Sequence, residues 1–157
     1  MPAASDPLPL GLPHTFRPLG VRLAIYILGG MLFGVCAAVW LAFPPHIKAE
    51  FTFFQRVTAI GIALGLIVIG YALVRSRVVA REDGVAVING YREHRYDWNE
   101  IVSVTLRPGA PWAVLDLSDG TSVSAVGIQG SDGSRAVTQV KQLRVMVADR
   151  TRTERDD

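Results

Sequence analysis

Two long apolar stretches dominate the first half of the chain. Neither the stretch from Leu23 to Phe43 nor that from Val57 to Val74 contains a charged residue. As α-helices they would be about 31 Å and about 27 Å long, against a bilayer hydrocarbon core of about 30 Å. A helix pairs its own backbone groups, as lipid requires. The pattern predicts a two-helix transmembrane hairpin over residues 21–77, with spans at about 23–43 and 57–74.

After residue 77 the pattern changes to short segments rich in β-branched residues, separated by turn residues. Six such segments between residues 78 and 128 predict six strands. Apolar residues then recur at helical spacing, at Ala136, Val140, Leu143 and Val147. We therefore expect a mainly β barrel or sandwich with a C-terminal helix over residues 78–149, followed by a charged tail at residues 150–157.

The N-terminal segment has a different composition. Residues 1–20 contain five of the nine prolines of the chain. Proline-rich segments favour extended, semi-rigid conformations. We interpret residues 1–20 as an extended or disordered cytoplasmic tail.

The turn residues of the β-rich part carry a resemblance to a known family. They are Asp83-Gly84, Asn89-Gly90, Tyr96-Asp97-Trp98-Asn99-Glu100-Ile101 and Leu117-Ser118-Asp119-Gly120. In this order they resemble bacterial PH-like domain proteins of high-GC Gram-positive bacteria, in which two membrane helices precede one such domain. The resemblance covers about residues 20–148. It implies seven strands and a C-terminal helix, whereas six strands are counted here, so one strand is missing, split or misread, and a β-sandwich without PH topology stays an alternative.

The resemblance also bears on function. It implies a binding or scaffold module and supplies no catalytic residues. Phosphoinositide-binding PH domains use basic residues around the first hairpin, but the turn interpreted as that hairpin, Glu82-Asp83-Gly84, is acidic. An acidic turn repels phosphate, so no phosphoinositide ligand is expected.

The net charge of +2 is unevenly distributed. Residues 1–77 carry six basic and two acidic residues, a surplus of +4, whereas residues 78–157 carry ten basic and twelve acidic residues, a balance of −2. A nucleic-acid-binding domain would place its basic surplus on the folded part, so no nucleic acid is expected. Five basic residues lie before the first span or after the second, and two lie in the connector between the spans. Because basic residues favour the cytoplasmic side, this predicts a multi-pass inner-membrane protein with both termini in the cytoplasm. These residues are Arg17, Arg22, Arg75, Arg77 and Arg81, against Lys48 and Arg56.

Three groups of residues are candidates for contacts. Small residues four apart let helices approach closely in lipid, which makes Gly30, Gly34, Gly61 and Gly65 candidates for helix packing, within the hairpin or against another subunit. Arg75, Arg77 and Arg81 would form a basic collar against the membrane surface, with the alternative that they only set the orientation of the spans. Trp112 becomes the best anchor for a partner if it is exposed.

Other chemistry has little support in the sequence. No ionisable residue lies inside either span, which argues against a transporter. One cysteine and three dispersed histidines exclude a disulfide framework and any short metal-ligand spacing. No phosphate-binding loop or nucleophile motif is present. We expect no enzyme, no cofactor and no metal.

The first hypothesis is a membrane protein whose PH-like module binds a protein partner or self-associates. The alternative is a small accessory subunit of a larger membrane complex that makes its contacts through the helices.

Overall fold

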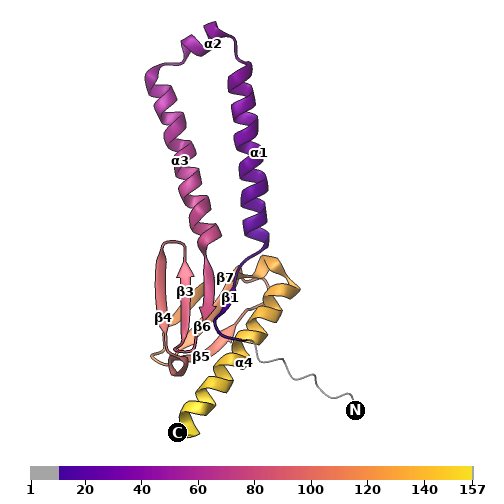
Figure 1. Ribbon diagram of the computed structural model, residues 1–157, viewed down its shortest axis with the longest axis vertical. Coiled ribbons are helices and arrows are strands. Elements are labelled where there is room, and N and C mark those ends of the chain that lie inside the picture. Colours follow the sequence, from indigo (N-terminus) through magenta and orange to yellow (C-terminus); the bar gives the residue numbers. More distant parts are fainter. Residues whose placement is uncertain (1–10, 157) are drawn as a thin grey trace. The chain divides into compact units, whose positions relative to one another are not determined.

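The computed structural model describes residues 11–156, with side chains as far as Thr151 (Figure 1). It contains two compact units. One is helical and comprises Leu19–Val74. The other joins the residues up to Pro18 with the chain from Arg75 onward. The chain therefore enters the second unit, leaves it for the helical unit, and returns.

The helical unit consists of α1 (Gly20–Ala42), the short α2 (Pro45–Glu50) and α3 (Phe53–Arg75). Both α1 and α3 are long and apolar enough to cross a membrane, and no residue of either is buried within the protein. They overlap the two expected spans: α1 begins three residues earlier and ends one residue earlier than expected, whereas α3 extends its span at both ends. An uncovered apolar surface of this size is unstable in water, so the two helices point to membrane association.

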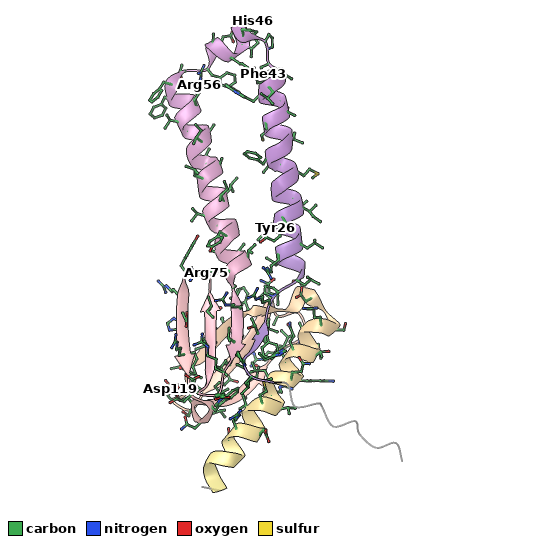
Figure 2. The ribbon with its side chains drawn as sticks, viewed as in Figure 1. Tyr26, Phe43, His46, Arg56, Arg75 and Asp119 are labelled. Carbon is green, nitrogen blue, oxygen red and sulfur yellow. The ribbon has the colours of Figure 1, made fainter. Side chains whose placement is uncertain are left out.

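The connector between these helices is held by local contacts. The amide of Thr52 donates to Oε1 of Gln55 at 2.9 Å, and the amide of Gln55 donates back to Oγ1 of Thr52 at 3.3 Å. This reciprocal pair is a capping box at the start of α3. Trp40, Phe43 and Phe51 pack edge to face or stacked, with ring centroids 5.3–6.4 Å apart. Figure 2 shows Phe43 and Arg56 at this end of the helical unit.

The second unit contains two antiparallel sheets. The first has the order β1 (His14–Phe16), β2 (Arg77–Ala80), β3 (Val85–Asn89), β4 (Arg92–Tyr96). The second has the order β5 (Ile101–Thr105), β6 (Trp112–Leu117), β7 (Ser122–Gln129). Two 3₁₀ turns, Trp98–Glu100 and Gly130–Asp132, lead into β5 and into the C-terminal helix α4 (Ser134–Asp156). The sheets form no closed barrel, and the expected mainly β unit with a C-terminal helix is confirmed.

The seventh strand is β1, and it precedes the membrane hairpin. His14, Thr15 and Phe16 pair with Ala80, Val79 and Val78. The interpretation of residues 1–20 as a tail is therefore wrong for residues 14–16, and residues 1–10 lie outside the described part. The error has a physical cause. The three residues of β1 are too few to show strand alternation, and their partner strand lies beyond both membrane helices.

This strand also changes the numbering of the turns. The connection between the first two strands is the two-helix hairpin itself, and Glu82-Asp83-Gly84 joins β2 to β3 instead. The acidic turn is therefore not the first hairpin, and its charge gives no reason to exclude a phosphoinositide ligand. The absence of a phosphoinositide ligand stays a prediction without that support.

The core lies between the two sheets and α4. Trp98, Phe16, Leu115 and Leu143 are fully buried there. The indole N–H of Trp98 donates to the backbone oxygens of Arg81 and Glu82, both at 3.1 Å. The helical spacing read from the sequence places the buried face of α4 correctly, at Ala136, Val140, Leu143 and Val147.

Candidate interaction sites

One end of the first sheet collects basic side chains next to the helix exits. Phe16 lies opposite Val78, so Arg17 follows β1 at the level of Arg77. The β3–β4 turn ends at the same level, because Arg77 pairs with Ile88, and Arg92 opens β4 opposite Asn89. We call Arg17, Arg75, Arg77 and Arg92 the basic end of the sheet. Anionic lipid headgroups attract such clusters.

A hydrogen bond fixes the β3–β4 turn at this end. The amide of Gly90 donates to Oγ of Ser76 at 2.9 Å, and Ser76 is buried directly after the last residue of α3. Gly90 has a φ of +62°, a left-handed conformation that glycine adopts without strain. The Asn89-Gly90 turn predicted from the sequence is therefore held at the point where the chain leaves α3.

The predicted collar of three arginines is only partly assembled. Arg75 and Arg77 lie at the basic end, but Arg81 follows the opposite end of β2, beside the turn to β3. The rise of a strand, about 3.3 Å per residue, separates Arg81 from Arg77 by about 13 Å. Arg17 and Arg92 take its place at the basic end. The sequence did not reveal them because their proximity depends on strand pairing.

The four glycines of the spans do not bring α1 and α3 together. A Cβ atom built at Gly30, Gly34, Gly61 or Gly65 meets no atom within 4 Å. The two helices meet elsewhere, where a Cβ on Gly70 would lie 3.4 Å from Cγ2 of Ile25. The structure therefore does not show the packing of α1 against α3 through these four glycines that the sequence predicted. Packing against another subunit stays a prediction.

Trp112 is partly exposed. It opens β6 and keeps 37% of its surface accessible, whereas Trp98 keeps 2%. Trp98 is therefore a core residue, and Trp112 lies at the rim. Trp112 therefore meets the condition set for a partner anchor, and that role remains a proposal.

Polar groups on the outer face of the second sheet centre on Asp116. Its carboxylate accepts from Oγ of Ser103 at 2.5 Å and from Oγ of Ser122 at 2.8 Å. These hydrogen bonds, first that of Ser103 and then that of Ser122, hold the pKa of Asp116 below its ordinary value, and Arg107 adds to the effect. Both hydroxyls donate to a carboxylate that stays ionised, so neither is activated as a nucleophile. Among the described residues no cluster of three metal-ligating side chains is found.

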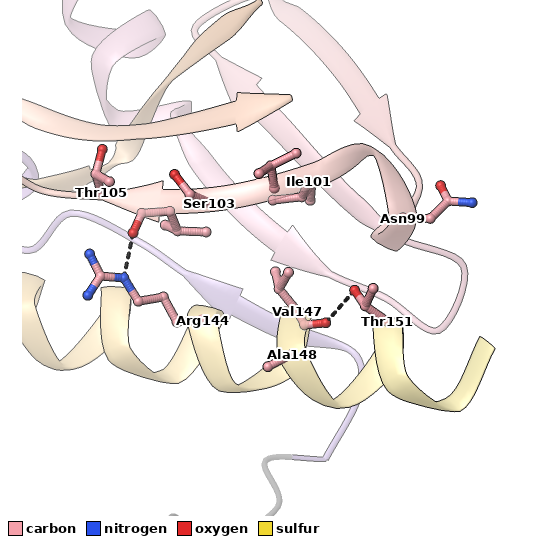
Figure 3. Close-up of a pocket in the computed structure, with 10 residues that line it drawn as sticks. Asn99, Ile101, Ser103, Thr105, Arg144, Val147, Ala148 and Thr151 are labelled. Atoms are coloured by element: carbon pink, nitrogen blue, oxygen red, sulfur yellow. Dashed lines mark hydrogen bonds between the residues drawn. The ribbon is translucent and has the colours of Figure 1, made fainter. Parts of the chain in front are cut away.

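A groove runs between β5 and α4 (Figure 3). Its volume is about 700 Å³, within the range of ligand clefts. The strand side consists of Ile101–Thr105, and the helix side of Arg144, Val147, Ala148 and Thr151. Arg144 Nε donates to the backbone oxygen of Val104 at 2.5 Å. Both elements follow from sequence patterns, whereas the groove does not, because strand order and helix docking are long-range features.

Comparison with known proteins defines the class. Residues 75–145 match the family model described as the bacterial PH domain. The chain thus carries a bacterial PH domain preceded by two helices long enough to span a membrane, which confirms the resemblance read from the turn residues. The matched segment contains β2 to β7 and part of α4, and β1 lies outside it.

The relatives come from mycobacteria. Over 88 residues the chain is 32% identical to uncharacterized proteins of Mycobacterium tuberculosis and Mycobacterium bovis. The matched region covers 55% of this chain and 57% of each relative, so the chain spans little more than half the length of the curated relatives it matches. No solved structure matches the chain.

Proposed function

We propose that this chain is a non-enzymatic, multi-pass protein of the cytoplasmic membrane that presents its PH domain at the cytoplasmic surface. The domain binds a protein partner or a second copy of the chain, and lipid contact is secondary. The observation that carries this proposal is the insertion of the membrane hairpin between β1 and β2. The domain is tethered on both sides, through Arg17–Leu19 before α1 and through Ser76 after α3.

A double tether of this kind restricts the domain to the membrane surface. A domain on one flexible linker samples a large volume, whereas two connections of three residues and one residue permit little travel. Arg17, Arg75 and Arg77 lie within or beside these connections in the chain, so they stay within reach of anionic headgroups when the spans are in lipid. A module held at the surface meets membrane-bound partners at high effective concentration.

A second candidate function has an observation of its own. The open space around Gly30, Gly34, Gly61 and Gly65 leaves small-residue faces on both helices without a partner in this chain. Such faces suit close packing against another membrane helix. On this alternative the chain is a small accessory subunit of a larger complex, and the helices make the contacts.

One experiment separates the two candidates. The full-length chain is cross-linked in native membranes, and the complex is sized after affinity capture. On the first proposal, Trp112→Ala diminishes the complex and the pair Gly30→Leu and Gly61→Leu leaves it intact. The reverse result favours the accessory subunit. Thr15→Ala, at an exposed position of β1, is the matched control for handling and expression.

A further inference from the structure

Three of the four sheet edges suit a further strand less well than the fourth. The outer edge of β7 is satisfied by the side chain of Asn89, whose Nδ2 donates to Ser124 O at 2.5 Å and whose Oδ1 accepts from the Val126 amide at 3.1 Å. The edge strand β4 carries Arg92, Glu93 and Arg95, so three of its five positions are charged, and charged edges resist pairing. The edge strand β1 has only three residues.

The remaining edge, that of β5, has the opposite character. Its sequence, Ile-Val-Ser-Val-Thr, carries no charge, and Val102 keeps 66% of its surface exposed. Arg144 reaches the Val104 oxygen from α4, so this oxygen points away from β6. In an antiparallel ladder the N–H and C=O of one residue point to the same side, so the Val104 amide also faces the groove. Five residues give an edge about 17 Å long.

The helix opposite this edge supplies an apolar floor and one charge. Val147 and Ala148 line the groove, and Arg144 is the one charged residue among the described residues that line it. Its guanidinium has five donors, and Nε bonds the Val104 oxygen, a hydrogen bond that an added strand would replace. The groove thus combines an uncharged strand edge, room for small apolar side chains and a cation that lacks a carboxylate in the lining.

We propose that the groove between β5 and α4 binds an extended, acidic peptide segment of a partner protein, which adds to β5 as a strand and places a carboxylate on Arg144. Strand addition of this type combines backbone pairing with side-chain pockets. A second copy fits less well. Two β5 strands paired about a two-fold axis would bring two Arg144 side chains into one interface, and the described lining of the groove supplies no carboxylate to either. This inference rests on the proposed function, because it names the partner chemistry of the same module.

The test uses the full-length chain in lipid nanodiscs and a defined probe. The probe is a fluorescent peptide of alternating threonine and valine with one central glutamate. Its controls carry glutamine or lysine at the centre, or N-methyl groups on alternate amides, which prevent strand pairing. We expect the glutamate peptide to bind at least about tenfold more tightly than the glutamine peptide, and the N-methylated peptide not to bind. Arg144→Glu should reverse the preference toward lysine.

Two helix variants provide the matched pair. Ala148→Phe fills the groove from an exposed position and should abolish binding, whereas Val137→Phe adds the same ring outside the groove and should leave it intact. Equal binding of the methylated peptide, equal binding by Ala148→Phe, or no binding of the glutamate peptide overturns the inference. Self-association that Ala148→Phe abolishes assigns the groove to a second copy and also overturns it. If the cross-linked complex depends on Trp112 but no peptide binds, the inference about the groove is wrong and the proposed function stands. A complex that depends only on the span glycines overturns the proposed function.

Discussion

Phe16 lies opposite Val78 in an antiparallel ladder, and both side chains are buried, with 1% and 0% of their surfaces exposed. Two apolar helices separate these residues in sequence. The sheet can gain β1 only after the chain has passed out through α1 and back through α3. The hairpin is therefore an insertion into the domain, and the domain is complete only when both ends of the hairpin return to it.

The first prediction concerns this strand. Phe16→Ala should destabilise the PH domain by about 3–5 kcal/mol, because it removes a buried ring and leaves a cavity. Denaturant unfolding of the full-length protein in detergent, followed by the fluorescence of the tryptophans, measures the loss. Thr15→Ala on the exposed face of the same strand is the control and should change stability by less than about 0.5 kcal/mol. Equal stability of the two variants would show that β1 is not part of the folded domain.

The second prediction concerns the buried indole. Trp98→Phe keeps most of the apolar volume but removes the N–H group that serves the Arg81 and Glu82 oxygens. Leaving buried acceptors without a donor costs about 1–3 kcal/mol. Thermal unfolding should show this loss, and hydrogen exchange should show faster opening of the β2–β3 turn. A stability unchanged from the wild type would mean that water replaces the indole at these oxygens.

The third prediction concerns the crossing of the two sheets. Gly127 in β7 passes so close to β2 that an added Cβ would lie 2.5 Å from the Cα atom of Arg77. Because neither backbone can move away easily, Gly127→Ala should lower the free energy of unfolding by about 1–3 kcal/mol or more. Gly65→Ala in α3 is the matched control, because its Cβ meets nothing within 4 Å. The control should be neutral or slightly stabilising, since alanine is the better helix former. The free energy of unfolding of both variants checks the difference.

The fourth prediction concerns pH. The hydroxyls of Ser103 and Ser122 lower the pKa of Asp116 in the folded state. A lowered folded-state pKa adds stability that is present above the ordinary carboxyl pKa of about 4 and is lost as the pH falls through the folded value. Ser103→Ala should raise the pKa of Asp116. The variant should be less stable than the wild type at neutral pH, and the difference between their free energies of unfolding should shrink below a pH of about 4. Carboxyl-carbon NMR titration measures the pKa, and an unshifted value in the variant would refute the assignment.

The elements of the domain that follow from short-range pattern could be predicted from sequence. The spans follow from length and polarity, and the Asn89-Gly90 turn follows from glycine's access to positive φ. The buried face of α4 follows from helical spacing alone. Each of these features depends on one continuous stretch of sequence.

The remaining features depend on residues far apart in the chain. The pairing of β1 with β2, the basic end formed by Arg17 and Arg92, and the groove beside β5 all require strand order, which no local pattern specifies. Arg144 looks like any exposed helical arginine until β5 is placed beside it. Likewise, the glycines of the spans suggested a packed hairpin, but whether two helices meet through a small-residue face depends on their partner.

The last prediction tests the orientation of the spans. In a chain whose only cysteine has been replaced by Cys36→Ala, single cysteines are introduced by His46→Cys in α2 and, in a second variant, by Lys141→Cys in α4. Both positions are exposed. The basic residues outside the connector outnumber those within it, so the connector should face the outside and the PH domain the cytoplasm. A membrane-impermeant maleimide should then label the α2 cysteine in intact cells and the α4 cysteine only after lysis.

The reverse pattern would place the PH domain outside the cell and would contradict both the orientation and the proposed cytoplasmic partner. Labelling of both sites before lysis, with cell integrity verified by an internal marker, would show that the helices do not span the membrane.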